Sequence, residues 1–245
     1  MRPLPTLALA ALVALAAAGC DDADARAPAD SPSADSAPAA APAVDEGAAG
    51  GRAAGAPARP AQARAASIDL GFTLGETDAP IAVVEFSDFG CPYCARFARA
   101  TLPTIGQEYI DPGAVRWRYV PVVFGFPGGE LMGSAAVCAA ELGGDEVFWR
   151  VHDLFYARQQ ALRDDGARPR LLDWVAELGV DRAALDACMD APGTAETLRV
   201  HTETAREWYV RGTPTFLVNG VPMAGAAPVD FFRKVFATVQ DPSGL

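Results

Sequence analysis

Two apolar runs separated by a helical stretch predict the centre of an α/β sheet. Residues 81–86 are apolar apart from Glu85, which is typical of a strand covered on both faces. Residues 115–120 alternate apolar and charged side chains and therefore predict a strand with one buried face. Between them, residues 91–109 predict a helix with a kink near Pro103. This order of elements predicts a parallel pair of strands joined by a right-handed crossover.

The second half of the chain predicts a block of helices followed by a hairpin. From about residue 129 to residue 208 there is no strand pattern, and glycine, proline and aspartate residues divide the stretch into four or five helices. Residues 215–218 predict a strand, Asn219-Gly220 a two-residue turn and residues 221–223 the partner strand. A last helix is expected over residues 229–239, where phenylalanine and valine recur at helical spacing. The pattern predicts an α/β fold with βαβ and ββα halves and an inserted helical subdomain.

The first twenty residues predict an export signal rather than part of this fold. An alanine- and leucine-rich run over residues 4–18 has the length of a signal-peptide core and is short for a membrane span. Residues 17–20, Ala-Ala-Gly-Cys, are similar to a bacterial lipoprotein processing site, although the first alanine stands where leucine is usual. We therefore expect a lipoprotein-type signal peptide over residues 1–20 and a lipid on Cys20. The alternative is plain secretion, with cleavage among the small residues before Cys20. In both cases the chain is exported, to the bacterial periplasm or the outer face of the cytoplasmic membrane, where disulfides persist.

Residues 21–67 predict a disordered tether between this signal and the folded domain. Of these 47 residues 20 are alanine, 6 are proline and none is aromatic, so the segment cannot bury enough apolar surface to fold. As a flexible coil it would span ~40 Å root-mean-square. That distance suits a lipid-anchored catalytic domain, although a linker with no length requirement fits equally well. The folded domain is expected over residues 68–245, with the helical insert at about 129–208.

The overall composition limits the kinds of partner. Hydrophobic residues make up 51% of the chain, which is enough for a buried core, and the formal net charge is −11. An acidic protein without a basic cluster in its sequence is not expected to bind nucleic acid.

The sequence Cys91-Pro92-Tyr93-Cys94 carries the candidate chemistry. It lies where the first predicted strand gives way to the helix, so Cys91 meets the unpaired N–H groups and the positive end of the helix dipole, which stabilise a thiolate. This arrangement favours thiol–disulfide exchange. A zinc half-site and an inert structural disulfide are the alternatives. A zinc site lacks its second half, because the two histidines of the chain are far apart in sequence.

Three segments of the chain together resemble a known family. They are Glu85-Phe86-Ser87-Asp88-Phe89-Gly90-Cys91-Pro92-Tyr93-Cys94, the stretch from Glu146 to Phe155, and Gly212-Thr213-Pro214-Thr215-Phe216. In this order and spacing they resemble the DsbA-like branch of the thioredoxin superfamily over roughly residues 68–240. The resemblance implies a thioredoxin fold with a helical insert and a thiol–disulfide oxidoreductase that needs no metal or organic cofactor. It also implies unfolded or Cys-containing exported proteins as substrates, and a membrane redox protein that resets the dithiol.

The two cysteines of the motif are expected to differ in role. Cys91, exposed at the helix start, should be the attacking thiol, and Cys94, one turn further, the resolving thiol. Pro92 fits the first turn of a helix, where its missing N–H costs nothing. Tyr93 stands where the best-known oxidant of the family has histidine, and a neutral side chain there predicts a weaker oxidant. Pro92 and Tyr93 are expected to face the substrate.

Glu85, Thr213 and Pro214 complete the candidate site. The resemblance implies that Glu85 is a buried acid behind Cys94 that exchanges protons with it, with a raised pKa. The alternative is an acid at a strand edge that reaches solvent. A cis Pro214 would present the backbone of Thr213 beside Cys91, where an extended substrate could pair with it; an ordinary trans turn is the alternative. Threonine before this proline occurs with oxidases, reductases and isomerases alike, so it leaves the direction of exchange open.

Five cysteines are an odd number for an exported chain. If Cys20 carries lipid and the motif cysteines pair, Cys138 and Cys188 remain, both in the predicted insert. Some DsbA-like proteins have a structural disulfide in this subdomain, so we expect one here, with two buried free thiols as the alternative. The chain is expected to act as a monomer, since residues 21–67 are too poor in apolar residues to form the dimerisation module of a dimeric isomerase. A reductase or isomerase with the same site remains the rival activity. A non-catalytic thioredoxin-like binding module is the rival from another class.

Overall fold

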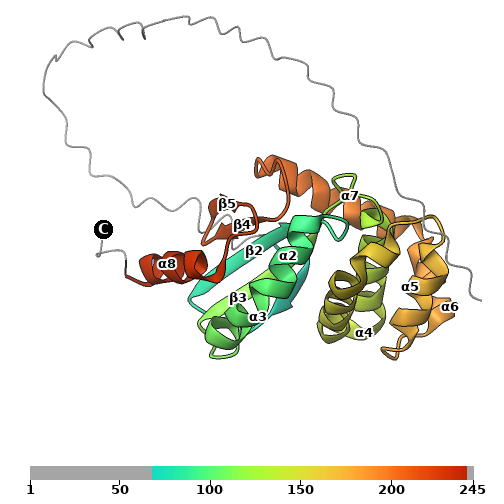
Figure 1. The fold of residues 1–245 in the computed structure, drawn as a ribbon, viewed down its shortest axis with the longest axis horizontal. Helices are drawn as coiled ribbons and strands as arrows, with labels where there is room; N and C mark the ends of the chain where they lie inside the picture. Colours follow the sequence, from blue (N-terminus) through green and yellow to red (C-terminus); the bar gives the residue numbers. More distant parts are fainter. Residues whose placement is uncertain (1–67, 242–245) are drawn as a thin grey trace, which may run out of the picture. The chain divides into compact units, whose positions relative to one another are not determined.

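The computed structural model describes residues 68–241 (Figure 1). The expected signal peptide, the lipid on Cys20 and the tether over residues 21–67 lie outside this part of the chain.

A five-stranded sheet forms the centre of the domain, in the order β1-β3-β2-β4-β5. The strands are β1 (Phe72–Leu74), β2 (Ile81–Ser87), β3 (Val115–Pro121), β4 (Thr215–Val218) and β5 (Val221–Ala224). The central pair β2 and β3 is parallel, as predicted, and the other pairings are antiparallel. Strand β1, which has only three residues, all half-buried, is not predicted by the sequence pattern.

The helices also follow the predicted pattern. They are α2 (Pro92–Ala100), α3 (Leu102–Ile105), α4 (Gly129–Arg158), α5 (Ala167–Ala176), α6 (Arg182–Met189), α7 (Pro192–Glu207) and α8 (Val229–Gln240), with a π-helical turn η1 (Gly106–Ile110) and a 3₁₀ turn η2 (Gln159–Leu162). The first predicted helix breaks between α2 and α3, next to Pro103. Helix α4 is interrupted at Gly144, whose φ of +81° is a conformation that glycine adopts without strain.

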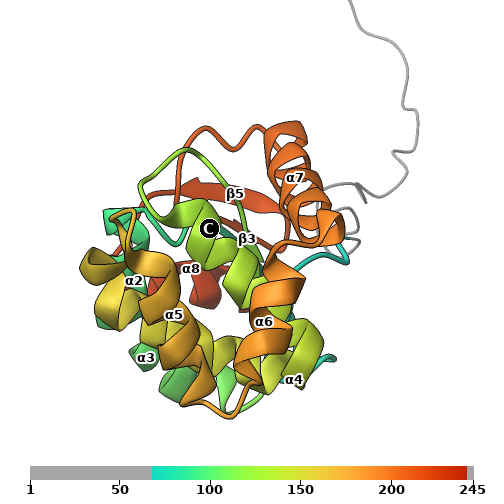
Figure 2. The same ribbon diagram turned by 90° about the vertical axis from the view of Figure 1, so that its right-hand side faces the viewer.

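The two faces of the sheet are covered unequally. One face packs against α2, α4, α5 and α8 in the main hydrophobic core, which contains Phe97, Trp117 and Phe216. The other face carries a smaller cluster in which Phe86 and Leu217 meet Ala205 near the end of α7. Figure 1 shows α4, α5 and α6 grouped on the right, and Figure 2 looks onto α5 and α6 from that side, with β3 and β5 behind them. Within residues 68–241 no helix has both the length and the apolar character needed to cross a membrane.

The architecture is therefore a thioredoxin fold with a helical subdomain inserted between its two halves. Its central strand β2 leads directly into the C-x-x-C motif at the start of α2.

Candidate active site

Cys91 is the residue that begins helix α2. Its backbone is extended (φ −73°, ψ 125°), Pro92 is the first helical residue, and the Cys91 N–H bonds to the carbonyl of Asp88 at 2.9 Å. The sulfur therefore meets the free N–H groups of the first helical turn, where negative charge is stabilised.

The structure corrects the expectation that Cys91 is exposed. The residue is fully buried, with 0% of its surface accessible. Its thiol donates a hydrogen bond to the carbonyl oxygen of Thr213 at 3.3 Å, and the peptide bond between Thr213 and Pro214 is cis. The loop that precedes β4 thus lies over the sulfur, a contact across more than a hundred residues that the local sequence does not reveal.

The two thiols have opposite acidities. The pKa of Cys91 is lowered to about 6, first by a hydrogen bond from the Cys94 thiol, then by the Thr213 hydroxyl and by the N–H groups of Cys94 and Tyr93, while burial works against this. Burial raises the pKa of Cys94 well above its usual range, and the neighbouring Cys91 raises it further. One sulfur is therefore available as a thiolate near neutral pH while the other keeps its proton.

Glu85 lies in β2 on the core side of the sheet. It is fully buried, so the alternative of an edge acid that reaches solvent is wrong. Desolvation raises its pKa to about 7, although hydrogen bonds from Ser87 and Trp117 act in the opposite direction. The Trp117 indole N–H bonds to Oε2 at 2.9 Å, and Oε1 has no partner among the described residues. A carboxyl in this state can hold or release a proton near neutral pH.

A chain of hydroxyl groups extends from Glu85 into the helical insert. Ser87 hydrogen-bonds to Glu85 and to Cys94, lowering the pKa of both. Its Oγ lies 3.2 Å from the hydroxyl of Tyr156, which in turn lies 2.6 Å from that of Tyr119. This cluster was not predicted from the sequence. Ser87 follows Glu85 by two residues on a strand and so shares its face, but the contribution of Tyr156 from α4 has no local signal.

Asp88 and Gln159 hold the turn that leads into Cys91. Asp88 accepts hydrogen bonds from the N–H of Gly90 at 2.8 Å and of Phe124 at 2.7 Å. The side-chain amide of Gln159 donates to the carbonyls of Phe89 at 2.6 Å and Cys91 at 2.9 Å. Both side chains are buried and were not among the predicted site residues.

The residues expected to face the substrate differ in exposure. Pro92 is exposed, and Tyr93 is 57% exposed with the Arg96 guanidinium 5.2 Å from its ring centre. Pro214 is buried and Thr213 is half-buried beside Cys91. Pro92 and Tyr93 are therefore the parts of the motif that are open to a partner.

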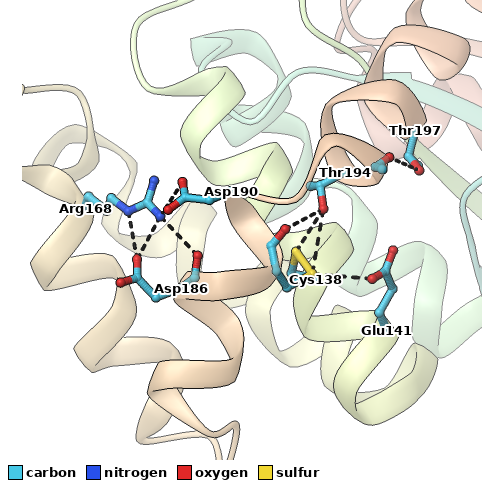
Figure 3. Close-up of a disulfide and its surroundings, with 9 residues drawn as sticks. Cys138, Glu141, Arg168, Asp186, Asp190, Thr194 and Thr197 are labelled. Carbon is cyan, nitrogen blue, oxygen red and sulfur yellow. Dashed lines mark hydrogen bonds and ion pairs between the residues drawn. A yellow bond between two sulfur atoms is a disulfide. The ribbon is translucent and has the colours of Figure 1, made fainter.

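Cys138 in α4 and Cys188 in α6 are joined by a disulfide, with sulfurs 2.06 Å apart (Figure 3). The hydroxyl of Thr194, at the start of α7, lies 3.3 Å from the Cys138 sulfur and donates to the Cys188 carbonyl at 2.8 Å. The bridge thus ties three helices of the insert together, whereas Cys91 and Cys94 are free thiols.

The chain resembles several known proteins. A family model described as Thioredoxin matches residues 69–236. Disulfide bond formation protein D of Bacillus subtilis is 29% identical over 165 residues, which cover 66% of this chain and 73% of that protein. The Na⁺/H⁺ antiporter NhaA 3 of Salinispora tropica is 33% identical over 154 residues, which cover 62% of this chain but only 22% of the antiporter. The crystal structure of oxidised BdbD from Bacillus subtilis matches with a TM-score of 0.62 and 26% identity, covering 68% of this chain and 91% of that one.

Proposed function

Because the chain belongs to the DsbA-like thiol:disulfide oxidoreductases of the thioredoxin superfamily, we propose that it forms disulfide bonds in exported proteins through Cys91 and Cys94. The observation that carries this proposal is the unequal acidity of the two thiols, with the pKa of Cys91 at about 6 and that of Cys94 raised. A thiol of low pKa is a good leaving group, so a disulfide that contains it is readily passed on.

The reaction starts from the oxidised Cys91–Cys94 pair. A substrate thiolate attacks the sulfur of Cys91, the bond between Cys91 and Cys94 breaks, and Cys94 leaves with the electron pair and takes up a proton. A second substrate thiolate then attacks the substrate sulfur of this mixed disulfide and expels Cys91 as a thiolate. The substrate has lost two electrons and gained a disulfide, and the enzyme is left as a dithiol. A membrane redox protein would remove the two electrons and restore the bond.

Glu85 is proposed to supply the proton that Cys94 needs as a leaving group. Cys94 is buried and its thiolate is disfavoured there, so its departure requires an acid nearby. With its pKa at about 7, Glu85 is protonated in a large fraction of molecules at neutral pH and connects to Cys94 through the hydroxyl of Ser87. In the reverse reaction Glu85 would accept the proton.

We also propose that the enzyme is a monomer tethered to a membrane by lipid on Cys20, on the basis of residues 17–20 and the composition of residues 21–67. Intact-mass analysis of the mature protein should show a chain that begins at Cys20 and carries acyl groups. A soluble product that begins elsewhere would contradict the anchor. Cys20→Ala should release the protein or block its processing.

The direction of exchange is tested by the reduction potential of the dithiol. The thiolate of Cys91 is stabilised more than that of thioredoxin, whose pKa is about 7, and less than that of the strongest oxidant, at about 3.5. We therefore expect a potential between about −270 mV and about −120 mV in equilibrium with glutathione. The full-length oxidised protein should introduce disulfides into a reduced, unfolded protein, and Cys91→Ser should not. A reduction potential near that of thioredoxin, about −270 mV, would indicate a reductase instead.

A further inference from the structure

We propose that an arginine-lined cavity beside helix α2 binds acidic side chains that flank the reactive cysteine of a substrate protein. This inference rests on the proposed function, since it names the class of polypeptide that the same dithiol would take.

The cavity has a volume of about 440 Å³ and lies between α2 and the end of α4. It is lined by Arg99, Ala157, Arg158, Gln159, Gln160, Ala161 and Trp174. Figure 1 shows α2 beside α4. The two cations come from helices far apart in sequence, which is why no basic cluster is visible in the sequence itself.

Both arginines lack a carboxylate partner among residues 68–241. Arg99 uses only its Nε, which donates to the carbonyl of Ala95 at 3.1 Å, so its terminal nitrogens are free to bind. The Arg158 guanidinium lies 4.5 Å from the ring centre of Trp174. A stacked guanidinium keeps its N–H groups available along its edge, in the geometry that binds a carboxylate with two hydrogen bonds.

Half of the other twelve arginines in the described domain are held in ion pairs, whereas both arginines at this cavity have none there. Ion pairs with aspartate or glutamate are formed by Arg118, Arg168, Arg170, Arg182, Arg199 and Arg233. In a chain of net charge −11, acidic side chains outnumber basic ones, so unpaired guanidinium groups gathered around one cavity are available for an external anion.

The cavity is joined to the active site by Gln159. This side chain lines the cavity and donates to the carbonyl of Cys91 at 2.9 Å. On the helix surface, Arg96 lies between the motif and the cavity, one turn before Arg99, with its guanidinium over Tyr93. Positive charge thus extends from the exposed part of the motif to the cavity.

The spacing predicts where the acidic residue of the substrate should stand. Arg99 follows Cys91 by eight residues of helix, or about 12 Å along the axis. An extended substrate chain covers that distance in about four residues. Acidic side chains three to five positions from the substrate cysteine are therefore the expected ligands.

The test uses three otherwise identical two-cysteine peptides with two glutamates, two glutamines or two lysines at these positions. Each is mixed with oxidised full-length protein at low salt, and the second-order rate of disulfide transfer is measured after acid quenching. The comparison is made between the parent protein and Arg99→Gln/Arg158→Gln, so any effect of the peptide charges on the peptide thiols themselves cancels. The matched control is Arg206→Gln. Arg206 is exposed, lies near the end of α7 and has no carboxylate partner in the described domain.

We expect the double substitution to lower the rate of disulfide transfer to the glutamate peptide about three- to tenfold more than the rate to the glutamine peptide. This size of effect corresponds to the loss of two exposed ion pairs. The effect should shrink in high salt, and Arg206→Gln should leave all three rates unchanged. If the ratio of the parent rate to the double-variant rate is the same for all three peptides, this inference is wrong and the proposed function stands. Failure of every peptide to react would instead refute the proposed function. Binding of both proteins to phosphatidylglycerol vesicles is measured as well. If the double substitution abolishes vesicle binding while the rate ratios of the three peptides stay equal, the cavity is a lipid site and the substrate proposal is wrong.

Discussion

The indole N–H of Trp117 donates a hydrogen bond to Oε2 of Glu85 at 2.9 Å, across two neighbouring strands, and both residues are fully buried. This bond favours the ionised carboxylate, but desolvation outweighs it and raises the pKa of Glu85 to about 7. The result is a buried acid that gains or loses a proton near neutral pH, where Cys91 and Cys94 would carry out thiol–disulfide exchange. Because Ser87 hydrogen-bonds to both Glu85 and Cys94, this carboxyl has consequences for both stability and chemistry.

The first prediction concerns the pH dependence of stability. Because the pKa of Glu85 is 4.5 in an ordinary setting and about 7 in the folded protein, the folded state binds a proton that the unfolded chain has released between these pH values. Stability therefore falls as pH rises through this window. Between pH 4.5 and pH 8 the free energy of unfolding of the reduced parent should fall by about 2–3 kcal/mol more than that of Glu85→Gln.

Urea unfolding of the reduced proteins at the two pH values measures this difference. Glu177→Gln removes an exposed glutamate and should behave like the parent. An equal fall in the parent and in Glu85→Gln would mean that the buried carboxyl is not protonated in the folded state.

The second prediction concerns the acidity of Cys91. Thiolate absorbance in the ultraviolet should titrate near pH 6 in the reduced protein, and Cys91→Ser should lack this step. Since the Cys94 thiol is the main donor to the Cys91 thiolate, Cys94→Ala should raise the pKa of Cys91. Cys94→Ser retains a hydroxyl donor and should change it less. If the alanine and serine variants titrate alike, the acidity of Cys91 comes from the helix and not from its partner.

The sequence predicted most of the fold because the relevant patterns are local. The apolar run that forms β2, the alternation that forms β3 and the turn at Asn219-Gly220 each depend on a few neighbouring residues. Strand β1 escaped prediction because three residues are too short for a period to be recognised. It is held by antiparallel pairing with β3 and by hydrogen bonds between Thr73 and residues of α4, which are tertiary contacts.

The site residues that are placed by their neighbours in sequence could be predicted. Those that are placed by contacts between distant segments could not. The placement of Cys91 at a helix start and of Glu85 in a buried strand could be inferred from adjacent residues. The burial of Cys91 could not, because Thr213 covers it from another part of the chain. Gln159 and Tyr156 were also missed, since a polar residue near the end of a long helix gives no sign of what it contacts in the fold.

The third prediction concerns the bridge between Cys138 and Cys188. The two residues are separated by 50 positions, and a loop of that size restricts the unfolded chain. Replacing both by alanine should lower the free energy of unfolding by about 2–4 kcal/mol. Thiolate titration of Cys91 in the same variant should remain near pH 6, because the groups that set its pKa do not include the bridge. An unchanged unfolding midpoint would show that the bridge does not constrain the unfolded state.

The last prediction concerns Gln159, which is 3% exposed and donates to the carbonyls of both Phe89 and Cys91. Gln159→Leu keeps the approximate size of the side chain but leaves two buried carbonyl groups without this donor. The loss should cost about 2–3 kcal/mol of unfolding free energy. It should also raise the pKa of Cys91, because the N–H groups of Tyr93 and Cys94 stabilise the thiolate only while the turn holds the sulfur in front of them.

Two measurements separate this positioning role from packing alone. Gln107→Leu makes the same substitution at an exposed position and should change neither stability nor the titration of Cys91. Gln159→Met, which is similar in shape and also lacks the donor, should reproduce the effects of the leucine variant on both. If both Gln159 variants lose stability while the thiolate still titrates near pH 6, the amide supports the fold without setting the acidity of Cys91. A raised pKa in both would show that the helical insert tunes the reactive thiol through the backbone carbonyl of Cys91.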